Sequence, residues 1–193
     1  MMGPVQARAL RAIAIGAAAM AVLAPSAGAT IVDGGKFSGS ETGVPDSLCG
    51  IDLVRDSTFS GSFLIRASTG GQAFFLHQVA DFRDAFTNPV NDRSMVFQGH
   101  SLINELTATQ VDGNVYEFKT IEAGVPFEVR DGAGNLVLRD RGVIRHDELF
   151  DTLGDGAPGG VVIDDQIVGV GGPHPALDQT DAEFCAMVTA LVG

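Results

Sequence analysis

Acidic side chains gather on a glycine-rich stretch near the end of the chain, where their spacing suggests a calcium site. Residues 151–156 read Asp-Thr-Leu-Gly-Asp-Gly, and two further aspartates follow. Ca²⁺ prefers carboxylate and carbonyl oxygens on a sharply bent loop. The spacing is not that of an EF-hand, because Leu153 stands at the third position and Val162 at the twelfth. The candidate ligands are Asp151, Asp155, Asp164 and Asp165, and the alternative is a solvated turn with local side-chain to backbone bonds.

The histidines offer a second candidate site. All four lie far apart in the sequence, without the close pairs that mark many zinc sites: His77, His100, His146 and His174. Side chains two residues apart in a strand share a face, so His146 and Glu148 would lie together. His146, Glu148 and His174 therefore form an alternative polar site, while structural or exposed histidines are the simpler interpretation.

Other catalytic signatures are missing from the sequence. The Gly-x-Ser-x-Gly motif of many serine hydrolases does not occur. The 24 acidic residues could form many carboxylate pairs of the glycosidase type, so no pair is singled out. With no Trp and one Tyr, the chain offers few platforms for sugar rings, and most of its 12 Phe lie on apolar faces, where core packing explains them. No residue is identified as catalytic.

Two cysteines, Cys49 and Cys185, are the only ones in the chain. An isolated pair near opposite ends of a domain usually forms a disulfide in an oxidising compartment. A redox role is disfavoured because no Cys-x-x-Cys motif is present. The sequence predicts a bridge between Cys49 and Cys185.

Residues 1–29 have the pattern of a secretory signal peptide. Arg8 and Arg11 precede an uncharged run over 12–24, and Ala27-Gly28-Ala29 supplies a small-residue cleavage site. Thirteen apolar residues rise only about 20 Å as a helix, less than the ~30 Å of a membrane core. We expect cleavage there, no stable membrane insertion afterwards, and a secreted, extracellular protein.

Removing 29 of the 193 residues leaves a 164-residue chain, which suits a single domain, 30–193. The leader holds two basic and no acidic residues, so the net charge of −12 becomes −14. Such a charge disfavours nucleic acid and anionic membrane surfaces as partners. Specific partners cannot be read from the sequence.

Period-two patterns dominate the domain. Phe59, Phe63 and Ile65 alternate with polar residues, which predicts a half-buried strand. Residues 73–87 fit a strand or a helix, and their aromatic content favours a long strand. Residues 30–47, rich in Gly, Ser and Asp, predict a surface lead-in with one short edge strand near Ile31.

Turn signals separate the later strands. Further strands are expected at 94–99, 102–111, 115–121, 127–130, 136–139, 143–149 and 161–170. Gly113 and the run 131–135 mark hairpins, while Gly124-Val125-Pro126 predicts an interruption. Residues 171–175 should break regular structure. Many short strands joined by turns indicate a mainly β protein, an antiparallel sandwich or barrel-like meander.

The C-terminus carries the one predicted helix. Thr180 and Glu183 form a capping box, and apolar residues follow at helical spacing: Phe184, Met187, Val188 and Leu191. A disulfide through Cys185 would hold this short amphipathic helix against the start of the strand region.

The chain resembles a group of small secreted bacterial β-rich proteins with no assigned activity. The resemblance rests on residues 151–156, on Gly172-Pro173-His174-Pro175 and on Phe184-Cys185, and covers most of the chain after the leader. It implies a signal peptide and a β-rich domain, and it assigns no catalytic residues.

The expected function is a secreted, non-catalytic binding or structural module, extracellular or associated with the cell envelope, with no required cofactor. One alternative is a small secreted hydrolase that uses a metal or paired carboxylates. A deep polar pocket joining His146 or His174 to two acids would favour that enzyme. Another alternative is a domain stabilised by calcium at residues 151–165.

Overall fold

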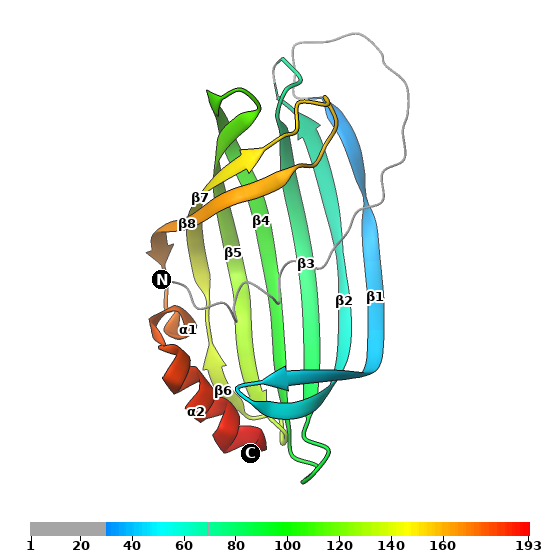
Figure 1. The fold of residues 1–193 in the computed structure, drawn as a ribbon, viewed down its shortest axis with the longest axis vertical. Coiled ribbons are helices and arrows are strands. Elements are labelled where there is room, and N and C mark those ends of the chain that lie inside the picture. The colour runs from blue at the N-terminus through cyan, green and yellow to red at the C-terminus, as the bar shows by residue number, and fades with distance from the viewer. Residues whose placement is uncertain (1–29, 69) are drawn as a thin grey trace.

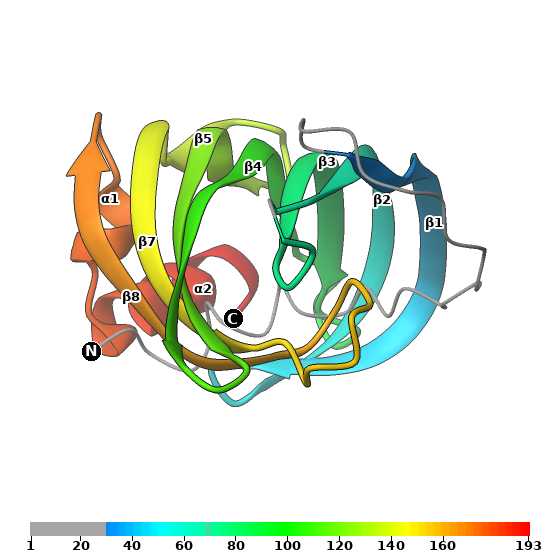
Figure 2. The same ribbon diagram turned by 90° about the horizontal axis from the view of Figure 1, so that it is seen from above.

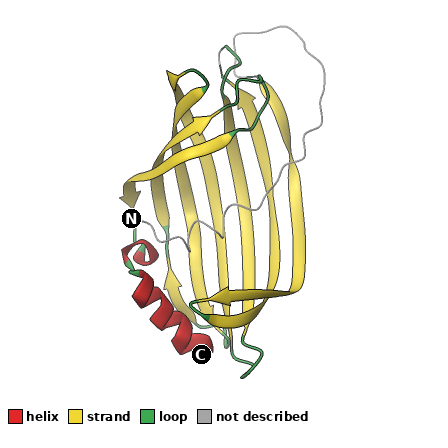
Figure 3. Cartoon of the chain, in the orientation of Figure 1, coloured by secondary structure: helices red, strands yellow, loops and turns green. Residues whose placement is uncertain are grey.

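A computed structural model describes residues 30–68 and 70–193. The chain forms eight strands followed by two helices (Figures 1 and 3). The elements are β1 (Ile31–Leu48), β2 (Ile51–Ala67), β3 (Phe74–Thr87), β4 (Ser94–Asp112), β5 (Val115–Asp131), β6 (Leu136–Arg139), β7 (Gly142–Asp151), β8 (Val161–Gly171), α1 (Pro175–Asp178) and α2 (Asp181–Val192).

All the strands belong to one antiparallel sheet, which confirms the predicted fold class. The strand order is β1-β2-β3-β4-β5-β7-β8, and the short β6 pairs with β5 beyond the end of β7. The arrangement found is therefore a meander rather than two stacked sheets, and β1 and β8 remain unpaired edges in the described part of the chain. Figure 2 shows that the sheet curls strongly, so it has a concave inner face and a convex outer face.

The N-terminal part of the sheet differs from the expectation for residues 30–47. The predicted lead-in is wrong, because β1 is an 18-residue strand paired along its length with β2. Its glycines permit close packing: a Cβ on Gly39 would lie 2.4 Å from the ring of Phe59. The ambiguous segment 73–87 is a strand, β3, as its aromatic residues favoured.

Two bulges control which side chains face inward in the middle of the sheet. Pro126 and Phe127 of β5 lie opposite Gly99 of β4, so the predicted interruption is a bulge within one continuous strand. Pro126 is tolerated there because a bulge does not require its missing N–H. A Cβ on Gly99 would come within 2.5 Å of the Pro126 carbonyl oxygen, so glycine is required. In β4, Leu106 is an extra residue between the paired Glu105 and Thr107.

The main core lies between α2 and the lower part of the inner face. Phe97 is at its centre, with ring centroids 5.1 Å from Phe86, 5.3 Å from Phe127 and 6.0 Å from Phe184 of α2. The cluster also contains Leu53, Met95, Val129, Leu138, Val188 and Val192. Since this cluster holds the helix against the curved sheet, it decides how the lower end of the fold is closed.

Both ends of α2 are satisfied by specific side chains. The predicted capping box is present, with Thr180 and Glu183 bonded reciprocally. At the other end, Asn88 donates to the Val192 carbonyl at 2.7 Å, and Arg93 donates to the carbonyls of Ala190 and Gly193. The four-residue α1 was not expected, and it begins at Pro175, the last residue of the predicted break over 171–175.

The predicted disulfide is also present. Cys49 lies in the tight turn between β1 and β2, and Cys185 lies on α2, with their Cα atoms 5.3 Å apart. The bridge therefore ties the first hairpin to the last helix. The signal-peptide prediction falls on residues 1–29, outside the described residues. Among the described helices, none has the length and apolar character needed to cross a membrane.

Candidate functional site

The four aspartates of the proposed calcium loop each have a different interaction partner in the structure. Asp151 and Asp155 each accept a hydrogen bond from the backbone N–H two residues later, at 2.8 and 3.0 Å. Asp164 accepts from Gln166, whereas Asp165 lies 3.0 Å from His146. Within residues 30–68 and 70–193, no three His, Cys, Asp or Glu side chains are placed to hold a metal ion. Asp151 and Asp155 are thus bonded to their own backbone, whereas Asp164 and Asp165 lie within β8.

The histidine-based prediction leads to a different part of the molecule. His146 and Glu148 share the inner face of β7, as their spacing indicated, and Asp165 of β8 is paired opposite Glu148. His174 is buried just before α1, with its Nδ1 3.9 Å from an oxygen of Asp140. Both histidines act electrostatically on Glu122, a residue that the sequence analysis did not select.

These groups belong to a band across the inner face, which we call the polar strip. Its members are Ser101 and Glu105 of β4, Thr120 and Glu122 of β5, His146 and Glu148 of β7, and Asp165 of β8. Thr120 is at the centre, because it is paired with Glu105 on one side and His146 on the other. Directly opposed residues place their Cβ atoms about 4.5–5.5 Å apart, so this row is compact.

The centre of the polar strip contains buried oxygens without hydrogen-bond partners. Thr120 is 4% exposed and Glu122 is 7% exposed. Among the described residues, neither the hydroxyl of Thr120 nor Oε1 of Glu122 has a hydrogen-bond partner, although Ser101 forms a side-chain hydrogen bond to Glu122. Each such buried polar group costs about 1–3 kcal/mol of folding free energy. The fold thus maintains acceptors here at a cost to its own stability.

Burial sets the protonation of the glutamates in the strip. Removal from water raises the pKa of Glu105 to about 7. The charge of Glu148 raises this pKa further, whereas a hydrogen bond from the Leu76 backbone N–H lowers it. Burial also raises the pKa of Glu122, opposed by Ser101 and by the two histidines. Near neutral pH, both the protonated and the ionised form of Glu105 are therefore populated.

An aromatic cluster adjoins the strip toward the upper end of the sheet. Phe118 is buried, and its ring lies 6.0 Å from Phe75 and 5.7 Å from Phe150 between centroids. Tyr116 adds a fourth ring, 6.5 Å from Phe118. Because Phe118 and Phe150 alternate with Thr120 and Glu148 along the same faces of β5 and β7, one surface joins apolar and polar groups.

The stability of the protein should depend on pH through Glu105. Its folded-state pKa of about 7 exceeds the ordinary 4.5, so the native state holds the proton more tightly than the unfolded state. The contribution of Glu105 to stability is then greatest below about pH 4.5 and falls by roughly 3 kcal/mol as pH rises to 7. Glu105→Gln, which keeps an acceptor for Leu76, should remove this loss and be more stable than the parent near neutral and higher pH.

Urea unfolding of the parent and of Glu105→Gln at about pH 4 and about pH 8 measures this effect. The matched control is Glu117→Gln, which changes a more exposed carboxylate on the outer face of β5, 2.6 Å from Lys119. Parallel pH profiles for the parent and Glu105→Gln would show that Glu105 titrates as an ordinary surface acid.

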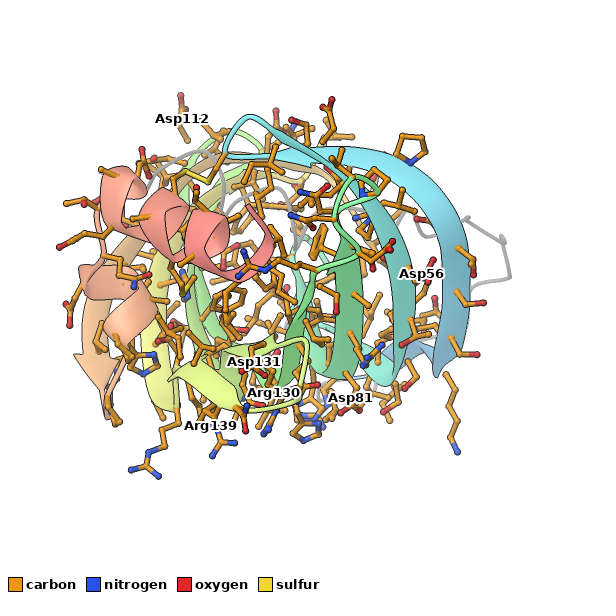
Figure 4. The ribbon with its side chains drawn as sticks, turned by 90° about the horizontal axis from the view of Figure 1, so that it is seen from below. Asp56, Asp81, Asp112, Arg130, Asp131 and Arg139 are labelled. Atoms are coloured by element: carbon orange, nitrogen blue, oxygen red, sulfur yellow. A yellow bond between two sulfur atoms is a disulfide. The ribbon has the colours of Figure 1, made fainter. Side chains whose placement is uncertain are left out.

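The outer face has different chemistry. A depression of about 490 Å³ lies over β1, β2 and β3, lined by Lys36, Ser38, Ser60, Ser62, Val79 and Asp81. Farther along this face, Arg130 and Arg139 pair with Glu128, and Figure 4 shows the two arginines projecting outward. Most residues around the depression are exposed, and Asp81 is paired with the exposed His100. We therefore place the candidate site on the inner face.

Sequence reasoning missed Glu105, Thr120 and Glu122. The alternation Tyr116, Phe118, Thr120, Glu122 was a usable signal, because it places the glutamate on the same face as two aromatic residues. Glu105 was harder to assign, since the extra Leu106 shifts the alternation immediately after it.

Comparisons with protein-family models, with curated proteins and with solved structures found no match to this chain.

Proposed function

We propose that the protein is a secreted, non-catalytic module that binds a small ligand on the inner face of its sheet. The disulfide and the leader pattern of residues 1–29 support an oxidising, extracellular location. The acidic composition argues against nucleic acid as the ligand. The polar strip and the neighbouring aromatic rings together suit a small molecule with an apolar body and a polar group.

The observation that carries this proposal is the pair of unpartnered oxygens at the centre of the strip. Thr120 and Glu122 are both more than nine-tenths buried, and they lie among ionisable groups supplied by β4 and β7. Native proteins retain few buried polar groups without partners. A ligand that bonds to these oxygens would explain why the fold buries them without partners.

The inner face is reachable as well as polar. Phe63, Gln78 and Phe150 occupy inner positions yet stay partly exposed. The edges β1 and β8 do not pair in the described structure, so the curled sheet does not close into a complete ring of strands. The partial exposure of these side chains supports access of a small molecule to the inner face.

A second candidate is a small hydrolase that uses the paired carboxylates of the strip. It is favoured by the pKa of Glu105, about 7, because a general acid or base works best when its pKa is near the ambient pH. Glu148 is close enough to raise that pKa further. In this case Glu105→Gln would abolish turnover while leaving substrate binding measurable.

Thr120→Val separates the requirements of folding and binding. Valine keeps the shape of threonine but removes the unpartnered hydroxyl, so we expect the free energy of unfolding to rise by about 1 kcal/mol. The same change should weaken binding of phenylbutanol, a neutral probe with an aromatic body and a hydroxyl, by about 1 kcal/mol or roughly fivefold.

Urea unfolding and NMR titration with phenylbutanol measure the two effects. Thr109→Val, which changes an exposed threonine on the outer face of β4, is the control and should alter neither quantity by much. Loss of stability in Thr120→Val together with unchanged probe binding would mean that the hydroxyl serves the fold and not a ligand.

A further inference from the structure

The polar strip has a strong imbalance of charge. It contains four carboxyl groups, those of Glu105, Glu122, Glu148 and Asp165, and one histidine, His146. Among the described residues from β4 to β8, every Lys and Arg lies on the outer face of the sheet or in a loop: Lys119, Arg130, Arg139, Arg141 and Arg145. Within the strip, acidic groups thus outnumber basic groups.

We propose that the ligand is a small organic amine, whose protonated nitrogen binds at Glu105, Thr120 and Glu122 while its apolar body packs on Phe118 and Phe150. This inference rests on the proposed function and specifies its ligand class. An ammonium group presents three hydrogen-bond donors and no acceptor. It therefore matches the unpartnered Thr120 hydroxyl and Glu122 Oε1, with the Glu105 carboxylate beside them.

The aromatic residues strengthen the preference for a cation. Phe118 and Phe150 form an edge-to-face pair next to the strip, and an ammonium group is attracted to the faces of such rings. An anionic ligand would instead meet four carboxyl groups, which would have to remain protonated. A neutral alcohol would satisfy the oxygens but would not balance their charge.

Amine binding should be linked to pH through the groups that surround the nitrogen. Glu105 is faced by Glu148, and Glu122 is faced by His146, His174 and Asp140. A cation favours the ionised carboxylates, so binding displaces a proton from Glu105. With a pKa of about 7, ionised Glu105 rises from roughly a tenth of the molecules at pH 6 to nine-tenths at pH 8. The apparent affinity should rise about tenfold over that range.

Three probes with the same body and different polar groups test the inference: phenylbutylamine, phenylbutanol and phenylbutyrate. Titration calorimetry of the disulfide-bonded protein at about pH 6 and pH 8, in buffers of different ionisation enthalpy, gives affinity and proton release. The amine itself stays protonated throughout, because its pKa is about 10. The variant is Glu105→Gln, and the matched control is Glu117→Gln on the outer face.

The expected result is that the amine binds more tightly than the other two probes at pH 8, about tenfold more weakly at pH 6, and with proton release at pH 6. Glu105→Gln should abolish the pH dependence, and Glu117→Gln should retain it. Equal or tighter binding of phenylbutanol or phenylbutyrate overturns the amine inference and leaves the binding proposal standing. If none of the three probes binds, the proposed function itself fails.

Discussion

Replacing both cysteines by alanine should destabilise the protein by about 2–5 kcal/mol, among the largest effects of any small change to this chain. The bridge joins residues 136 positions apart, and the chain-entropy model assigns such a loop about 5 kcal/mol. Structurally, the bridge fixes α2 to the β1–β2 turn, so its loss removes the covalent link between the first hairpin and the last helix. Urea unfolding of the Cys49→Ala/Cys185→Ala variant measures the loss.

The reduced parent protein should match the double variant, since both lack the cross-link. Ala186→Ser, on the exposed side of α2, is the control and should change stability by less than about 0.5 kcal/mol. A double variant as stable as the oxidised parent would mean that the noncovalent contacts of α2 suffice to hold the helix.

Phe97→Ala should cost about 3–5 kcal/mol, because it removes the ring around which the main core is built. Phe97 contacts two other sheet phenylalanines and Phe184 of α2, so the resulting cavity would lie between the sheet and the helix. Thermal and urea unfolding both report the loss.

Phe59→Ala is the matched comparison for that core substitution. Phe59 is 36% exposed, with Phe37 as its one ring neighbour among the described residues, at 6.4 Å, so its truncation should cost much less. Equal losses for the two variants would contradict the placement of the core under α2, because the sheet alone would then account for the stability.

Local sequence signals predicted much of this fold. The capping box of α2, the Cys49–Cys185 bridge and the hairpin around Gly113 each depend on a few neighbouring residues or on simple pairing, and each is present. β1 was missed because its Gly, Ser and Asp residues have low strand propensity. Pairing with β2 along its length overrides that propensity.

Only part of the candidate site could be predicted from the sequence. His146 and Glu148 could be placed together by the two-residue period of a strand. Glu122 and His174 are 52 positions apart, and only the strand order β5-β7-β8 followed by the turn from β8 into α1 brings them together. The composition of the acidic tract 151–156 suggested a calcium site, yet its carboxylates accept hydrogen bonds from their own backbone.

The most direct test of the account is to locate a bound probe on the sheet. Methyl NMR spectra recorded during a phenylbutanol titration distinguish the inner face, reported by Thr120 and Ile144, from the outer depression, reported by Val79. Binding at the polar strip predicts saturable shifts at Thr120 and Ile144 with Val79 unchanged. Shifts confined to Val79, or no saturable shift at any of the three, would contradict an inner-face binding site.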